Sequence, residues 1–227
     1  FKGPVMPVNP HAQAIEGVLA YPDIERLPAT PDLAVVCTPA VTVPGVIDAL
    51  GAKGCRSAVI ISAGFSEAGE EGRARQKETL EIAQRRGMRL IGPNCVGVIA
   101  PGSSLNASFA HRHAPAGGIG FLSQSGAVLT SVLDWAADRG VGFSVMASMG
   151  AMADVDFGDM ISWLAKDAAT RAILIYAEQI TDAPKFMAAA REAAQLKPVI
   201  AIKPGRHAEA AEAAFSHTGA LAGADAV

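Results

Sequence analysis

The sequence predicts an α/β fold built from two parallel-sheet units in series. Three features indicate this: short apolar runs alternate with longer helical segments, the runs hold few polar residues, and a stretch rich in Gly, Pro, Ser and His near residues 101–118 separates two rounds of the alternation. Strands that are apolar throughout are typical of parallel sheets covered on both faces. We therefore expect one domain at residues 1–113 and a second at residues 114–227.

The first domain is expected to contain four strands and two helices. Each predicted strand is a short, mainly apolar run that ends at turn-forming residues: Pro4–Val8, Leu33–Cys37, Ala58–Ser62 and Arg89–Gly92. The helices are expected between successive strands, at Pro44–Lys53 and Glu67–Arg86. This alternation is expected for a parallel sheet covered on both faces.

The second domain is expected to repeat the same pattern. Its predicted strands are Ile119–Leu122, Phe143–Ala147, Ala172–Ala177 and Val199–Ile202. Two apolar stripes with helical spacing predict core-facing helices; they consist of Val128, Leu129, Val132, Leu133 and Ala136, and of Phe157, Met160, Ile161 and Leu164. A helical stretch over His207–Phe215 is expected to precede another helix that starts at Thr218 or Gly219.

Composition narrows the function classes. The chain has 227 residues, of which 50% are hydrophobic and 18% charged, so it can bury a large core. A net charge of −3 gives no basic surface for nucleic acid or an anionic membrane, and the apolar runs are too short to cross a bilayer. Three cysteines without a C-x-x-C pair favour a reducing cytoplasm, and His111 and His113 lack the further ligands of a metal site. The chain opens on Phe1 and stops within an expected helix, which predicts a piece of a longer polypeptide.

Three segments of the second domain point to phosphate chemistry. Open parallel sheets hold their ligands at the carboxyl ends of the strands, and a helix N-terminus there favours an anion. Ser123, Gln124, Ser125 and Gly126 form such a strand-to-helix turn, Glu178 follows another strand, and His217 precedes the helix start at Thr218 and Gly219. An imidazole oriented by a carboxylate can accept a phosphoryl group. Taken singly, each residue is equally explained as a helix cap or a surface side chain.

The first domain has turns of another kind. Small residues follow its expected strands, and a nucleotide can lie against the backbone of such turns, although each is also ordinary turn chemistry. The set is Val8, Asn9, Pro10, Thr38, Pro39, Ala40, Ser62, Ala63, Gly64 and Asn94. A G-x-G-x-x-G loop is not found in the sequence, and neither is a strand that would carry it.

Four motifs in fixed order resemble one enzyme family. They are Arg89–Ile99, Gly120–Ala127, Glu178 and Ser216–Ala220. Together they are similar to the nucleoside-diphosphate-forming acyl-CoA synthetases, which include the ADP-forming acetyl-CoA synthetases and are related to the succinyl-CoA synthetase α subunit. The resemblance covers nearly the whole chain. It implies a Rossmann-like CoA-binding domain that lacks its first strand and Gly loop, followed by a flavodoxin-like parallel-sheet domain.

The resemblance also implies roles. His217 matches the phosphorylated histidine, Glu178 the glutamate that stabilises it, and the turns at residues 123–126 and 218–219 the phosphate-holding helix starts. The turns of the first domain match those that line coenzyme A. The implied reaction converts acyl-CoA, phosphate and ADP reversibly into carboxylate, CoA and ATP through an acyl phosphate and a phosphohistidine. It requires an ATP-grasp domain or subunit, absent from this chain, that binds ADP or ATP with Mg, and it implies an oligomer.

Two other functions stay open on the sequence. Related protein lysine acetyltransferases carry a synthetase-like region that senses CoA and regulates a fused domain; several of these lack the histidine that His217 matches. A nicotinamide-dinucleotide redox module is disfavoured, because Val8-Asn9-Pro10 stands where an acidic ribose-binding residue is expected. Thr130 and Val96 replace a tyrosine and a proline of succinate-using relatives, which favours a simple acyl group over a dicarboxylate.

Overall fold

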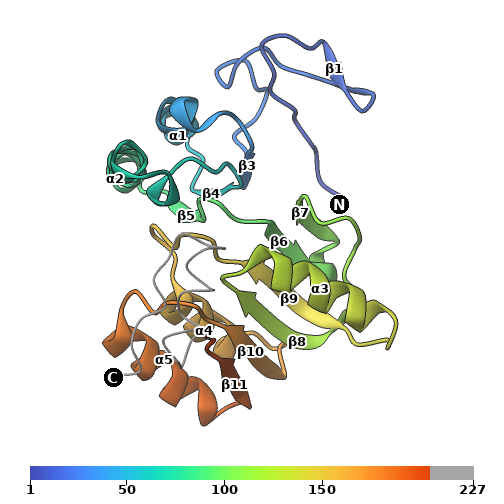
Figure 1. The fold of residues 1–227 in the computed structure, drawn as a ribbon. Coiled ribbons are helices and arrows are strands. Elements are labelled where there is room, and N and C mark those ends of the chain that lie inside the picture. Colours follow the sequence, from blue (N-terminus) through green and yellow to red (C-terminus); the bar gives the residue numbers. More distant parts are fainter. Residues whose placement is uncertain (205–227) are drawn as a thin grey trace.

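The computed structural model describes residues 1–204, and their main strands form two sheets (Figure 1). One has three strands and lies nearer the N-terminus; the other has six. A two-stranded hairpin, β1 (Ala14–Ile15) and β2 (Val18–Leu19), stands apart from both. The α/β fold expected from the alternating apolar runs is confirmed.

The first sheet is parallel, in the order β3-β4-β5. Its strands are β3 (Ala34–Val36), β4 (Ser57–Ile60) and β5 (Arg89–Ile91). The crossover helices α1 (Val43–Ala52) and α2 (Glu70–Arg86) each follow a short 3-10 turn, η1 (Ala40–Thr42) and η2 (Ser66–Ala68). Both helices lie on one side of the sheet in Figure 1, where Ile47, Ile60 and Leu90 are fully buried.

The second sheet is mixed, in the order β11-β10-β8-β9-β6-β7. Four strands run parallel: β8 (Ala116–Ser123), β9 (Phe143–Ser148), β10 (Ala172–Tyr176) and β11 (Val199–Ile202). An antiparallel pair, β6 (Gly97–Ala100) and β7 (Leu105–Ser108), extends the β9 edge, with η3 (Pro101–Ser103) between them. The parallel core matches the expected strands; the antiparallel edge was not foreseen.

Helices cover both faces of this second sheet. On one face, α3 (Gly126–Ala137) packs through Leu129 and Leu133 against Phe121 and Met146. On the other, α4 (Phe157–Lys166) and α5 (Ala183–Ala194) share a core with residues of β9 and β10. Asp156 caps α4 in a capping box with Asp159. The stripes predicted for α3 and α4 are core faces, as expected, whereas α5 was not predicted.

Two details of the N-terminal and middle segments differ from the sequence prediction. The strand expected at Pro4–Val8 is wrong: Val8 makes a single bridge to Tyr21, and proline at positions 4 and 7 removes two of the N–H donors that a ladder needs. The change from one sheet to the next occurs between β5 and β6, so residues 97–108 pair within the second sheet. The division into domains at residues 113 and 114 stays a prediction.

The chain segment after β9 ties the two sheets together. The N–H groups of Ala151, Ala153 and Val155 donate to the carbonyl groups of Pro93, Gly92 and Leu90, at 2.9, 3.0 and 3.1 Å. Arg89 adds ion pairs to Asp154 and Asp159, at 3.0 and 3.1 Å. The pKa of Asp159 lies below its ordinary value: burial acts to raise it, but the hydrogen bond from Lys185 and the nearby positive charges outweigh burial.

Gly150 sits where this pairing begins, and its backbone has φ of +56°. A Cβ atom there would lie 2.2 Å from the carbonyl oxygen of Pro93. Gly140 has a similar φ of +64° but open space around it, so it serves as the matched control. We expect Gly140→Ala to lower the free energy of unfolding by about 1–2 kcal/mol, because alanine adopts a left-handed backbone conformation less readily than glycine. Gly150→Ala should cost about 3 kcal/mol or more, because a steric clash is added.

Urea denaturation of both variants measures this difference. Equal losses of stability in the two variants would contradict the close approach of residue 150 to Pro93.

Candidate functional site

The turn between β8 and α3 is held by its two serines. Ser123 is fully buried, and its hydroxyl donates to the carbonyl oxygen of Ser125 at 2.7 Å. Ser125 is the N-cap of α3, since its Oγ accepts from the Val128 N–H at 3.3 Å. The hydroxyl proton of Ser125 is not used in that bond. The first N–H groups of α3, at Gly126 and Ala127, precede the hydrogen-bond ladder of the helix. They therefore lie with the Ser125 hydroxyl at the carboxyl edge of the second sheet, where several hydrogen-bond donors come together.

Close packing leaves Gly126 no room for a side chain. A Cβ on this residue would lie 2.6 Å from Cγ2 of Val96. Val96 in turn donates its N–H to Oγ of the buried Ser148, at 3.0 Å. The start of α3 is thus set against the segment that leaves β5, so a ligand at the helix start would also meet residues near Asn94.

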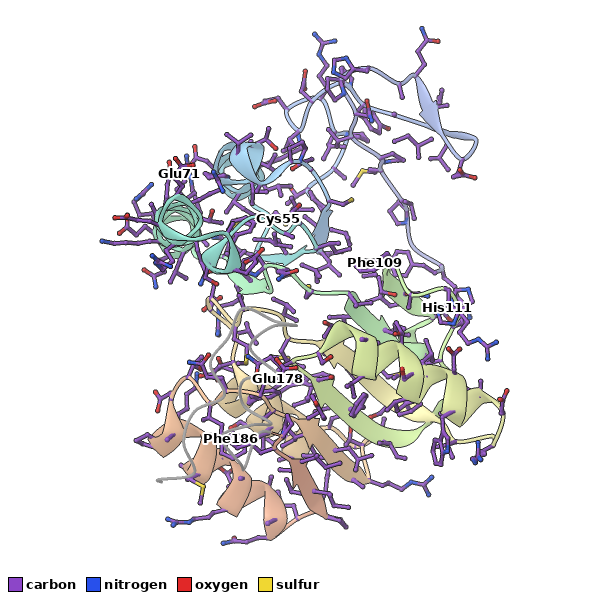
Figure 2. All side chains as sticks on the ribbon, in the orientation of Figure 1. Cys55, Glu71, Phe109, His111, Glu178 and Phe186 are labelled. Atoms are coloured by element: carbon purple, nitrogen blue, oxygen red, sulfur yellow. The ribbon has the colours of Figure 1, made fainter. Side chains whose placement is uncertain are left out.

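Glu178 lies at the carboxyl end of β10 and is 7% exposed. Figure 2 shows it between the two sheets, away from His111. Gln124, from the β8–α3 turn, accepts from the N–H groups of Glu178 and Gln179 through one side-chain oxygen, at 3.0 and 2.8 Å. The pKa of Tyr176 is raised, first by burial and then by the negative charge of Glu178. The predicted phosphate turn and the predicted carboxylate are therefore neighbours in the structure.

The strand-end turns of the first sheet are also linked to one another. The Ser62 hydroxyl donates to the carbonyl oxygen of Thr38 at 2.5 Å, and the Asn94 N–H donates to the carbonyl oxygen of Ser62 at 3.0 Å. A Cβ on Gly64, whose φ is +104°, would lie 2.9 Å from Cβ of Ala40. Thr38, Pro39, Ala63 and Asn94 are exposed. These turns form one edge of small residues against which an extended ligand can lie.

A backbone path joins the two sets of turns. The Met149 N–H donates to the carbonyl oxygen of Ser123 at 2.8 Å, and two residues further on Ala151 donates to Pro93. Together with the bonds above, this path makes one hydrogen-bonded row of turns that runs from Thr38 to Glu178. The sequence interpretation missed the Met149–Ala151 segment, although its place directly after an apolar strand is the signal that marks such turns.

Two groups of predicted site residues are not part of this row. Val8, Asn9 and Pro10 belong to the N-terminal segment, where the Asn9 side chain accepts from the N–H groups of His11 and Ala12 and its own N–H donates to Tyr21. In the described part of the chain, the bonds of Asn9 stay within residues 9–21. His217, Thr218 and Gly219 lie outside the described residues, and their roles stay predictions.

Cys95 and His111 have structural partners. Burial raises the pKa of the Cys95 thiol to about 12, and its Sγ donates to the carbonyl oxygen of Ile60 at 3.3 Å. His111 pairs with Asp134 at 2.7 Å. Over residues 1–204, no group of three or more His, Cys, Asp or Glu side chains is arranged to hold a metal ion. The interpretation of Cys95 as a packing residue fits its burial.

Family comparisons agree with this geometry. Residues 2–101 match the CoA binding domain, and residues 116–227 match the succinyl-CoA ligase like flavodoxin domain. The chain belongs to the ADP-forming acyl-CoA synthetase family. The resemblance drawn from the four sequence motifs is therefore confirmed.

The relatives of this chain are longer than it is. It is 45% identical over 223 residues to an ADP-forming acetate–CoA ligase I of Archaeoglobus fulgidus, covering 98% of this chain and 33% of that protein. It is 42% identical to the α subunit of an ADP-forming acetate–CoA ligase II of Pyrococcus furiosus, and this match covers 97% of this chain and 48% of that subunit. The chain thus spans between a third and half of these relatives.

A solved structure gives the same fold. It is a dinucleotide-forming acetyl-coenzyme A synthetase 1 from Ca. Korarchaeum cryptofilum in complex with phosphate and ADP, with a TM-score of 0.91 and 37% identity over 99% of this chain and 48% of that one. These relatives give no support to the regulatory alternative of a lysine acetyltransferase. Among the described helices of the chain, none is long and apolar enough to cross a membrane.

The burial of Cys95 predicts how the three cysteines of the chain react. At pH 8, a pKa of about 12 leaves roughly one Cys95 thiol in ten thousand ionised, and only the thiolate is nucleophilic. Cys37 is exposed and serves as the internal control. We expect iodoacetamide to modify Cys37 in the native protein, to leave Cys95 unmodified, and to modify all three cysteines after unfolding in guanidinium, as read by peptide mass spectrometry. Comparable native labelling of Cys95 and Cys37 would contradict the burial.

Proposed function

We propose that this chain is the CoA-binding and phosphohistidine-carrying part of an ADP-forming acyl-CoA synthetase. The observation that carries the proposal is the continuous row of turns from Thr38 to Glu178, which sets small-residue turns suited to a nucleotide beside a helix start suited to phosphate. The names of the relatives favour acetate or a similarly simple acyl group as the carboxylate.

The proposed reaction has three reversible steps. A phosphate oxygen attacks the thioester carbon of acyl-CoA; the C–S bond breaks, and CoA leaves as a thiolate that takes up a proton. An imidazole nitrogen of His217 then attacks phosphorus, the bond from phosphorus to the acyl oxygen breaks, and the carboxylate leaves. In the last step, a terminal oxygen of ADP attacks the phosphorus of the phosphohistidine, which yields ATP and free histidine.

Most of the work assigned to the protein is electrostatic. Ser125 and the first N–H groups of α3 supply neutral donors and the positive end of the helix dipole for the phosphate. Glu178 accepts a hydrogen bond from the imidazole N–H, which leaves the other nitrogen of His217 free to attack and stabilises the positive charge that develops on the ring. Thr218 and Gly219 are proposed to open a second helix toward the same phosphate.

Coenzyme A is proposed to bind along the turns at residues 38–40 and 62–64, with Asn94 at the junction toward the phosphate. The small residues and close approach of Gly64 to Ala40 keep the backbone within reach of a nucleotide. Val8, Asn9 and Pro10 are proposed to complete the site. ADP with Mg would be held by an ATP-grasp domain or subunit, and the assembly is proposed to be oligomeric. Three free cysteines suit the reducing cytoplasm that we propose as its compartment.

Labelled acetyl phosphate tests the phosphohistidine. We expect the protein to take up one phosphoryl group that is labile in acid and stable in base, because phosphoramidate bonds hydrolyse on protonation. His217→Ala should take up none. His113→Ala is the matched control: His113 is exposed and paired with Asn106, and its replacement should leave labelling unchanged.

Label that persists in His217→Ala would place the phosphoryl group elsewhere. No label in the wild-type protein, even with an ATP-grasp partner added, would overturn the synthetase proposal.

Ligand-dependent thermal unfolding tests the cofactor. A ligand at 100 times its Kd stabilises the folded state by about 2.7 kcal/mol, which corresponds to several degrees for a chain of this size. We expect coenzyme A to raise the unfolding temperature in this way and NAD to leave it unchanged. Gly64→Val, which adds a branched side chain beside Ala40, should reduce the shift caused by CoA. A shift with NAD and none with CoA would favour the dinucleotide-binding alternative.

A further inference from the structure

Gln124 connects the two halves of the phosphate site through three hydrogen bonds. Its backbone N–H donates to the carbonyl oxygen of Tyr176 at 3.0 Å, and its side-chain oxygen accepts from Glu178 and Gln179 as described above. Ser123 and Tyr176 are the last paired residues of β8 and β10, so Gln124 stands one step beyond the sheet ladder. It extends the pairing of the two strands into their loops.

The two donors settle which way the amide is turned. Both partners are backbone N–H groups, and only the oxygen of an amide can accept from them. Two consecutive N–H groups fill the two lone pairs of Oε1. The amide oxygen of Gln124 is therefore committed to the backbone at residues 178 and 179.

This commitment adds a second role to the one expected from the sequence, where Gln124 was grouped with the phosphate ligands. We propose that Gln124 is a positioning residue: it fixes the backbone at Glu178, and through it the carboxylate that orients the phosphorylated histidine. The inference rests on the proposed function, because it assigns Gln124 a part in that same site. Ser125, whose hydroxyl proton is not used in its bond with Val128, and the start of α3 remain the donors to phosphate.

We call the two hydrogen bonds from the N–H groups of Glu178 and Gln179 to the Gln124 oxygen the clamp. The position of Glu178 explains why it is needed. Glu178 follows the last residue of β10 by two positions, beyond the parallel ladder that holds Tyr176. A carboxylate 7% exposed loses most of its hydration, so small changes in its direction alter its interaction with a nearby imidazole strongly. Two bonds to adjacent backbone N–H groups restrict both position and rotation of this peptide segment.

Amide hydrogen exchange in the full-length protein tests the clamp without depending on activity. We expect Gln124→Met, which keeps the shape but removes the acceptor, to speed exchange at residues 178 and 179 about tenfold, as loss of one net hydrogen bond would. Gln124→Glu keeps an acceptor oxygen and should retain protection. Gln195→Met replaces an exposed glutamine at the C-cap of α5 and is the matched control. Unchanged exchange in Gln124→Met, or lost protection in Gln124→Glu, would overturn the proposal.

Phosphorylation by acetyl phosphate tests the functional half. In Gln124→Met the maximal rate of histidine phosphorylation should fall between about tenfold and 100-fold, as for a reacting group displaced by about an ångström. The half-saturating acetyl phosphate concentration should stay within about twofold, since the phosphate donors remain. A raised half-saturating concentration with an unchanged maximal rate would make Gln124 a phosphate ligand. Unchanged kinetics despite faster exchange would show that the clamp does not serve catalysis.

The two proposals fail in different ways. Absence of phosphorylation in the wild-type protein would refute the synthetase function and leave the exchange result standing. Thermal unfolding of each variant shows whether the fold is retained, and Gln124→Glu separates loss of the acceptor from loss of structure.

Discussion

The antiparallel pairing of residues 151–155 with residues 90–93 holds the carboxyl ends of two separate sheets against each other. Parallel strands present ligand-binding turns at one edge only, so two such sheets form a common site only if those edges meet. Three backbone hydrogen bonds and the Arg89 ion pairs fix that meeting in register. The ion pairs of the solvent-exposed Arg89 set a direction of approach, whereas the backbone pairing specifies residue against residue.

This junction accounts for the composition of the neighbouring turns. Backbone passes close to backbone or side chain at Gly150, Gly126 and Gly64, and each of these positions would clash with a Cβ atom. The glycines thus have a packing reason that does not depend on a ligand. The same lack of side chains leaves N–H groups accessible at the start of α3 and along the first sheet, which is what phosphate and a nucleotide require. Close packing and ligand binding therefore both require glycine at these positions.

A buried carboxylate in a site for anions needs an explanation. Glu178 would repel phosphate if it approached directly, and its charge already raises the pKa of Tyr176 after the effect of burial. The arrangement suits a site in which the carboxylate contacts an imidazole and the phosphate contacts the helix start. Gln124 links the two loops that carry these groups, the β8–α3 turn and the segment after β10. In the site proposed above, the carboxylate, the cationic ring and the phosphate would follow one another with charges that alternate in sign.

The sequence by itself determined the parallel strands of both sheets, the buried stripes of α3 and α4 and the family, because apolar periodicity and motif order are local properties. It was wrong at Pro4–Val8. It missed β6 and β7, which are too short to show a clear period, and α5, whose buried face consists mainly of alanine. Only the tertiary structure decided that residues 97–108 join the second sheet, that Met149–Ala151 bridges the two sets of turns, and that the oxygen of Gln124 faces Glu178 and Gln179. Such pairings depend on which hydrogen-bond donors and acceptors meet across more than 50 residues of chain, as they do for Gln124 and Glu178. No local pattern in the sequence encodes that meeting.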